Sequence, residues 1–286
     1  MDAKQTNKIE SLRKSPPDAF IDNQFNQCPE KILSYLPAQG MDAKRVVDFG
    51  CGHGLKALSV ALQRPEIEVI GVDVTQAFER ATVFAIKHLG LAGIPENLRF
   101  HQISPGQSLG ALGSLDFIYS WSVFEHIDMS LLTQIANDMF DSLSDEGHVF
   151  CQIAPLYYSP YGSHLRDFVD EPWAHLSLSH SALRALVEDA ENPALDQGEK
   201  NKRRWMFGQY EALNKLTAKQ LESIFLDAGF TFLEKTVKSV RLRPDNPLTH
   251  VYQSSPLLEN ELFYFVEKSS GRARGGFSLR PWRRRA

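Results

Sequence analysis

The amino-acid sequence predicts an α/β fold in which a doubly wound, mostly parallel sheet carries helices on both faces. Three observations predict this fold. Five short apolar runs between residues 45 and 154 alternate with segments of helical periodicity, and the first run ends in a cluster of glycines. The alternation stops at Pro155 and resumes at Thr217. Parallel strands need helical crossovers, so the alternation indicates a parallel sheet with an insertion after its fifth strand.

The first part of the sheet has the clearest pattern. After a polar N-terminal extension over residues 1–40, strand-length apolar runs and helix-periodic segments follow one another. Short runs rich in valine, isoleucine and phenylalanine are typical of buried strands, and apolar residues three or four apart are typical of helices. We expect strands at 45–49, 68–74, 98–103, 115–120 and 148–154, and helices at 27–36, 55–63, 76–89 and 130–143.

The pattern changes after the fifth strand. Residues 155–216 are rich in aromatic, proline and histidine residues and have no strand pattern. A helix is expected from Thr217, a residue type that caps helix N-termini, to Gly229, a residue type that ends helices. Two β-rich stretches follow this helix. These stretches are 230–242 and 261–269, and the expected organisation is one domain at 41–154 and 217–268, an insertion at 155–216 and a tail at 269–286.

The composition is that of an ordinary globular chain, with 43% hydrophobic residues, 23% charged residues and a formal charge of −4. This charge argues against a general attraction to nucleic acid. The tail is an exception, because residues 271–286 contain six arginines and no acidic residue. Such a segment is typical either of a solvated terminus or of a site for nucleic acid, acidic lipid or an acidic partner.

The cysteines indicate a reducing compartment. Cys28, Cys51 and Cys151 are widely spaced and form no Cys-x-x-Cys pair, which argues against a disulfide framework or a zinc site. The N-terminus lacks the apolar stretch of a signal peptide, and no apolar run approaches the ~20 residues that span a bilayer. We therefore expect a cytoplasmic protein with no membrane span.

The strongest chemical signal is the sequence VVDFGCGHG at residues 46–54. It follows a predicted strand and opens a predicted helix, the context in which glycine loops bind ligands. Glycines let the backbone approach a ligand, and the helix start offers unpaired N–H groups. A dinucleotide loop reads G-x-G-x-x-G. Counted from Gly50, its third glycine would fall at Leu55, but it stands at Gly54. This spacing argues against an NAD-type oxidoreductase, which is one alternative function.

Two carboxylates accompany the glycine loop. Asp48 places a negative charge beside it, which would repel a pyrophosphate but suits the ammonium group of an amino-acid moiety. Asp73 ends the second predicted strand, where an ionised carboxylate can accept hydrogen bonds from a ribose diol. The charge of Asp48 therefore favours S-adenosylmethionine (SAM) over NAD as the ligand, whereas Asp73 supports a nucleoside ligand without distinguishing between the two.

The sequence resembles the class I SAM-dependent methyltransferases. VVDFGCGHG resembles their first motif and VIGVDV (69–74) their second. LDFIYSWSVFEHI (115–127) resembles their fourth-strand segment, LSDEGHVFCQIAP (143–155) their fifth-strand segment, and LTAKQLESIFLDAGF (216–230) the helix before their sixth strand. The motifs occur in the family's order. The resemblance implies SAM as the cofactor and a seven-stranded sheet whose last two strands form an antiparallel pair.

The resemblance also implies a set of cofactor-binding residues. The glycines would line the methionine part of SAM, Asp48 would hold its amino group, Asp73 would bind its ribose and Val74 would pack on its adenine. Family members often have an acidic residue after the third strand, whereas this chain has Ser104 there. The full expected set is Asp48, Gly50, Cys51, Gly52, Gly54, Asp73, Val74, Ser104, Ser120 and Trp121.

The acceptor site is expected in the insertion. Ligands of open α/β sheets bind beyond the carboxyl ends of the strands, and a long segment at such a place is typically a lid or a binding element. We hypothesise that 155–216 caps the active site. An oxygen nucleophile needs a base with a near-neutral pKa, which histidine supplies. The catalytic candidates are His164 first, then His126 and His175, with Tyr157 also in this segment. No metal is expected, because the histidines lack HExxH-like spacing.

The leading interpretation is a SAM-dependent methyltransferase that acts on a small-molecule acceptor, at oxygen. One alternative is a nucleic-acid methyltransferase that uses the arginine tail. Against it, Ser120-Trp121-Ser122 stands where base-amino methylators have an Asn/Asp-Pro-Pro-aromatic motif. Another alternative is a non-catalytic binding module, because a fold does not fix a function. The sequence leaves the acceptor and the oligomeric state open.

Overall fold

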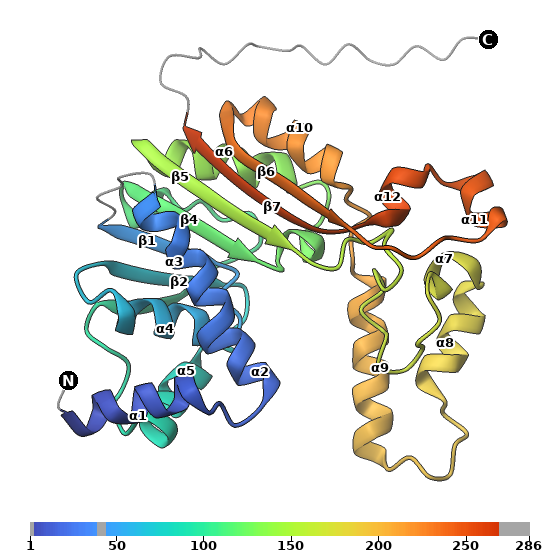
Figure 1. Ribbon diagram of the computed structural model, residues 1–286, viewed down its shortest axis with the longest axis horizontal. Coiled ribbons are helices and arrows are strands. Elements are labelled where there is room, and N and C mark those ends of the chain that lie inside the picture. The colour runs from blue at the N-terminus through green and yellow to red at the C-terminus, as the bar shows by residue number, and fades with distance from the viewer. Residues whose placement is uncertain (1–2, 39–43, 269–286) are drawn as a thin grey trace.

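The computed structural model describes residues 3–38 and 44–268, and within them one seven-stranded sheet has the order β3-β2-β1-β4-β5-β7-β6 (Figure 1). Strands β1 to β5 are parallel, and β7 is antiparallel to both β5 and β6. This arrangement confirms the predicted fold class. The strands are β1 (Arg45–Phe49), β2 (Glu68–Asp73), β3 (Leu98–Gln102), β4 (Leu115–Trp121), β5 (Leu143–Ile153), β6 (Phe230–Ser239) and β7 (Glu259–Lys268).

Helices from the first third of the chain cover one face of the sheet. Successive strand residues point to opposite faces, so Val46, Phe117 and Phe150 pack against these helices. The segment 3–38 is more than a polar extension, because Phe25 and Ile32 are fully buried in the same core. The helical elements on this face are α1 (Ala3–Lys14), α2 (Ala19–Ile21), η1 (Asp22–Gln27), α3 (Cys28–Ala38), α4 (Leu55–Gln63), α5 (Glu79–Phe84) and η2 (Ala85–Leu89).

Two helices cover the opposite face, α6 (Leu132–Ser142) and α10 (Ala218–Ala228). They bury Met139 and Phe225 against the alternate strand residues, such as Val47, Ile118 and Val149. Helix α10 has the expected ends. The Thr217 side chain and Gln220 form a capping box, and Gly229 follows with a φ of +105°.

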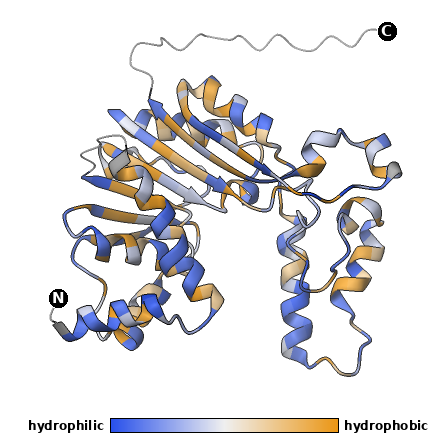
Figure 2. Cartoon of the chain, in the orientation of Figure 1, coloured by the Kyte–Doolittle hydropathy of each residue, from blue (hydrophilic) through white to orange (hydrophobic). Residues whose placement is uncertain are grey.

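The insertion forms a helical arm beyond one end of the sheet (Figure 1). Its helices α7 (Ala174–Ser177), α8 (His180–Glu188) and α9 (Gln197–Glu211) enclose a small core around Leu165, Leu183 and Phe207. Helix α9 is largely hydrophilic (Figure 2), which fits a helix that buries only Phe207. Helices α11 (Asn246–Val251) and α12 (Ser254–Leu258), between β6 and β7, join the arm, because Leu248 and Leu257 pack on Trp173.

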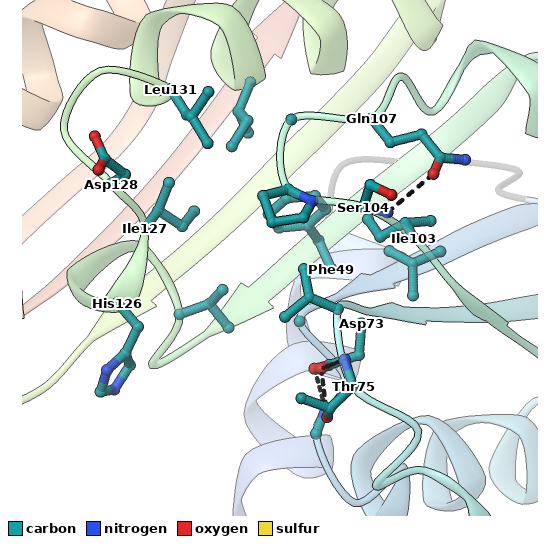
Figure 3. Close-up of a pocket in the computed structure, with 18 of the residues that line it drawn as sticks. Phe49, Asp73, Thr75, Ile103, Ser104, Gln107, His126, Ile127, Asp128 and Leu131 are labelled. Carbon is teal, nitrogen blue, oxygen red and sulfur yellow. Dashed lines mark hydrogen bonds between the residues drawn. The ribbon is translucent and has the colours of Figure 1, made fainter. Parts of the chain in front are cut away.

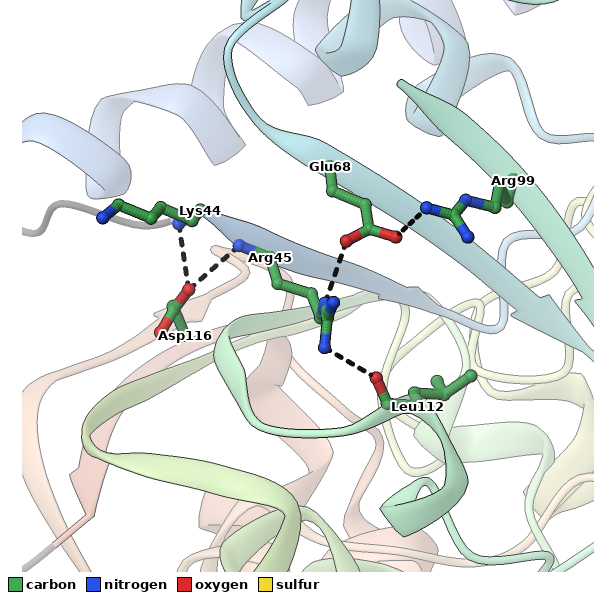
Figure 4. Close-up of polar contacts among 6 residues, drawn as sticks. All are labelled: Lys44, Arg45, Glu68, Arg99, Leu112 and Asp116. Carbon is green, nitrogen blue, oxygen red and sulfur yellow. Dashed lines mark hydrogen bonds and ion pairs between the residues drawn. The ribbon is translucent and has the colours of Figure 1, made fainter. Parts of the chain in front are cut away.

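The amino ends of β1 to β4 carry a polar cluster (Figure 4). Glu68 accepts from Arg45 at 2.9 Å and pairs with Arg99 at 2.5 Å, which ties β1, β2 and β3 together. Asp116 accepts from the backbone N–H groups of Lys44 and Arg45, each at 2.9 Å. These partly exposed pairs fix the amino ends of the strands and leave the carboxyl ends free for ligands.

The sequence also led us to expect no membrane span and an arginine-rich tail. Within the described ranges, no helix is both long and apolar enough to cross a membrane. The arginine tail lies outside the described residues.

Candidate functional site

A cavity of about 560 Å³ opens at the carboxyl ends of β1, β2 and β4. Figure 3 shows its walls, with Asp73 and Thr75 on one side, the segment from His126 to Leu131 on another, and Ser104 and Gln107 between them. The lining is mainly apolar, with Val74, Ile103, Val123 and Leu131 beside a few polar groups. This volume and this mixture are typical of a small-molecule or cofactor site.

The glycine loop between β1 and α4 forms the floor of the cavity. Gly50, Gly52 and Gly54 all have left-handed φ values, of +76°, +52° and +73°. A Cβ on Gly50 would lie 2.4 Å from Val123 and a Cβ on Gly54 2.7 Å from Phe100, so both positions need glycine for packing as well. A Cβ on Gly52 would meet nothing within 4 Å. The loop therefore leaves an open space at Gly52.

Asp73, at the end of β2, holds the loop in place. One of its carboxylate oxygens accepts from the Gly52 N–H at 2.8 Å. The other accepts from the backbone N–H and the hydroxyl of Thr75, at 2.8 and 2.9 Å. The carboxylate also lines the cavity. Since each oxygen has two lone pairs, Asp73 can position the loop and still accept hydrogen bonds from a ligand.

Asp48 lies beneath the loop and not in the cavity wall. It is fully buried, near the Tyr119 hydroxyl and the Lys56 ammonium. Neither carboxylate oxygen has a hydrogen-bond partner within the part of the chain that the structure describes. Burial raises its pKa to about 6, against the lowering influence of Lys56, so the group is mainly ionised at neutral pH. Asp48 therefore supplies a poorly compensated negative charge under the glycine loop.

The expected cofactor residues fall into two groups. Gly50, Gly52, Asp73, Val74 and Ser104 line the cavity together. The other five are not among its lining residues, and the Trp121 ring packs on Phe150 and Phe263 with 6.1 Å between the ring centroids. These five are Asp48, Cys51, Gly54, Ser120 and Trp121.

Ser122, in the segment expected at the site after the fourth strand, lines the cavity with a left-handed φ of +53° and donates from its hydroxyl to Gln152 at 3.1 Å. Other lining residues were not anticipated from the sequence. Asp128 and Asp138 line it from the loop after β4 and from α6, and Gln209 reaches it from α9 in the insertion. The loop after β4 was recognisable from its place after a strand, whereas Gln209 has no sequence signal because only the folded arm brings it there.

Of the predicted catalytic residues, His126 is the one that lines this cavity. His164 packs edge-on against it, with 5.5 Å between the ring centroids, and its Nε2 is buried without a hydrogen-bond partner in the described chain. Burial lowers the pKa of both histidines, that of His164 to about 4. Tyr157 and His175 line a separate, smaller cavity, where the His175 Nε2 donates to the Tyr157 carbonyl at 2.7 Å.

No group of three or more metal-ligating side chains occurs among the residues that the structure describes. The sheet order, the glycine loop and the acid at the end of β2 define the class I SAM-dependent methyltransferases. The chain belongs to the family described as "Methyltransferase domain", whose model matches residues 20–235. No curated protein matches the chain.

Solved structures share the fold. An O-methyltransferase family protein from Burkholderia thailandensis is 14% identical, with a TM-score of 0.52 over 94% of this chain and 64% of its own. A putative O-methyltransferase from Nostoc punctiforme is 16% identical, with a TM-score of 0.50 over 93% and 70%. A putative sarcosine dimethylglycine methyltransferase from Galdieria sulphuraria is 12% identical, with a TM-score of 0.50 over 85% and 86%. At these identities the likeness shows the fold alone.

The residues present suit SAM, the cofactor of this class. The space above Gly52 allows a ligand to approach the loop backbone. The buried carboxylate of Asp48, although near the Lys56 ammonium, favours a cationic group above the loop, and SAM carries both an ammonium and a sulfonium. The apolar walls at Val74, Ile103 and Leu131 suit a nucleobase.

Proposed function

We propose that this chain transfers the methyl group of SAM to an oxygen of a small-molecule acceptor. The observation that carries the proposal is the position of His126, on the wall of the same cavity as Gly52 and Asp73. A histidine beside a SAM site is a suitable base for a hydroxyl acceptor.

SAM supplies an activated methyl group, so the protein mainly has to align the acceptor and exclude water. Gly52 and Asp73 are proposed to hold the methionine part and the ribose of the cofactor. Asp48 acts through its charge from beneath the loop. Val74 and Ser104 are proposed to flank the adenine.

His126 is proposed to accept the proton of the acceptor. Burial lowers its pKa, so the imidazole is neutral at pH 7 and has a free lone pair. His164, edge-on to His126, is proposed to position that ring. This assigns the contact with the acceptor to His126 and a supporting role to His164.

The insertion at 155–216 is proposed to cap the site, because Gln209 of this segment lines the cavity. A small molecule suits a cavity of about 560 Å³ better than a polynucleotide does. The reducing cytoplasm is the proposed location, because all three cysteines are free and buried.

The test is a screen of hydroxylated small molecules with methyl-labelled SAM, followed by kinetics of His126→Ala on the best acceptor. We expect kcat of His126→Ala to fall by about a hundredfold, the usual contribution of a general base. Binding of S-adenosylhomocysteine should be retained. The matched control is His101→Gln, an exposed histidine on β3. Full turnover of His126→Ala would refute the assignment of the base.

A further inference from the structure

A second cavity, of about 280 Å³, lies in the arm and has mostly aromatic walls. Four tyrosines from separate segments meet there with two histidines and a lysine, namely Tyr157, Tyr158, Tyr210, Tyr252, His175, His180 and Lys215. The glycine loop and the cofactor residues contribute nothing to its lining. The chain therefore builds a separate site from the insertion and from the segment between β6 and β7.

The rings of this cavity contact one another edge to face or tilted. The centroids of Tyr157 and Tyr158 are 5.3 Å apart, those of Tyr157 and His175 5.2 Å, and those of Tyr158 and Tyr252 5.8 Å. Edge-to-face packing keeps ring faces available to a ligand. Such walls favour a ligand that has a flat aromatic ring.

The polar groups of the cavity favour one negative charge. The Lys215 ammonium lies 5.8 Å from the centroid of the Tyr157 ring, and no carboxylate lies within 4.0 Å of it in the described part of the chain. The acid nearest in sequence, Glu211, is paired at 2.9 Å with His180, which also lines the cavity. Burial raises the pKa of the Tyr157 hydroxyl, so it stays protonated and can donate. One cation with hydroxyl donors matches a carboxylate better than a doubly charged phosphate.

Neighbouring residues of the chain line the two cavities. Tyr210 lines the second cavity and Gln209, its neighbour on α9, lines the first. The Asn214 side chain, next to Lys215, donates to the carbonyls of Phe124 and Ile127, both at 2.6 Å. These carbonyls lie on either side of His126 in the sequence, so the contacts tie the chain beside Lys215 to the segment that carries the proposed base.

We propose that the tyrosine cavity is the recognition site for the acceptor, and that the acceptor carries an aromatic carboxylic acid anchored by Lys215. This inference rests on the proposed function, because it takes the ligand to be the methyl acceptor. It narrows the acceptor from any hydroxylated small molecule to the aromatic monocarboxylates.

The experiment is a calorimetric titration of the full chain, first with S-adenosylhomocysteine and then, at saturation, with benzoate, 4-hydroxybenzoate and phenylacetate. Benzamide and phenyl phosphate test the need for a single negative charge. We expect at least one acid to bind more tightly than both, and Lys215→Gln to weaken that binding by about tenfold or more, as expected for a charged hydrogen bond. The control is Lys219→Gln, an exposed lysine on α10. Tyr252→Phe, a conservative change, should also weaken the binding of that acid.

The outcomes separate this inference from the proposed function. Binding of S-adenosylhomocysteine without binding of any of the three acids overturns the inference and leaves the methyltransferase assignment intact. Equal binding to wild type and Lys215→Gln, or tighter binding of benzamide or phenyl phosphate, also overturns it. Failure of S-adenosylhomocysteine to bind contradicts the proposed function itself.

Discussion

Glu125, beside the proposed base, should make the stability of the protein fall as the pH rises. Its side chain is 3% exposed, and neither carboxylate oxygen has a hydrogen-bond partner in the described chain. Burial raises its pKa from 4.5 to about 8. The folded state therefore keeps a proton that the unfolded state releases between these two values. The contribution of the protonated Glu125 to stability is therefore fully present below its pKa in the unfolded state, 4.5, and is lost as the pH rises through its pKa in the folded state, about 8.

The size of the effect follows from the shift. A shift from 4.5 to about 8 corresponds to about 5 kcal/mol at pH 9, at ~1.4 kcal/mol per pKa unit. At pH 7 the loss is about 3 kcal/mol by the same arithmetic. These are upper values, because local rearrangement or water entry would reduce them. Glu125→Gln has nearly the shape of the protonated acid and no charge, so it should remove the loss.

The assay is urea unfolding of wild type and Glu125→Gln at pH 5, 7 and 9. The two proteins should be similar at pH 5, and the variant should be progressively more stable at pH 7 and pH 9. Glu96→Gln, at an exposed glutamate, is the matched control and should show no such trend. Parallel stability curves for wild type and Glu125→Gln would refute the reasoning.

Two further predictions concern the loop and a helix cap. Gly54→Ala should lower the free energy of unfolding by about 1–3 kcal/mol, since the residue has a left-handed φ and Phe100 lies against it. A Cβ at Gly52 would meet nothing within 4 Å, so Gly52→Ala should cost less stability than Gly54→Ala. It should, however, weaken the binding of S-adenosylhomocysteine. Equal losses of stability for the two variants in urea unfolding would contradict this account. Thr217→Ala should lower the free energy of unfolding by about 1 kcal/mol, because it removes the capping box of α10. An unchanged urea midpoint would argue against the cap.

The sequence was most informative where local pattern and fold agree. The first five strands and helix α10 were predicted because apolar periodicity and cap residues act over short distances. Strand β5 begins at Leu143, earlier than the expected 148, because Leu143 pairs with Leu115 beyond an irregularity in the ladder. Such a pairing depends on a distant strand and leaves no local signal.

The site was predictable in part for the same reason. Gly52 and Asp73 follow from a motif whose geometry is local. Asp48 also belongs to that motif, but its position beneath the loop depends on packing with Tyr119 and α4. The place of Trp121 at the cofactor stays a prediction, and its ring packs on Phe150 and Phe263. Gln209 enters the cavity only through the fold of the arm.

The most direct test of the central claim is calorimetric titration of the purified chain with SAM and S-adenosylhomocysteine, with NAD as the control ligand. The account predicts that the first two bind, that NAD does not, and that Asp73→Ala abolishes binding. Thr75→Val, which removes one hydroxyl donor to Asp73 but keeps the carboxylate, should still bind. Absence of binding by wild type, or unchanged binding by Asp73→Ala, would contradict the assignment of this cavity to the cofactor.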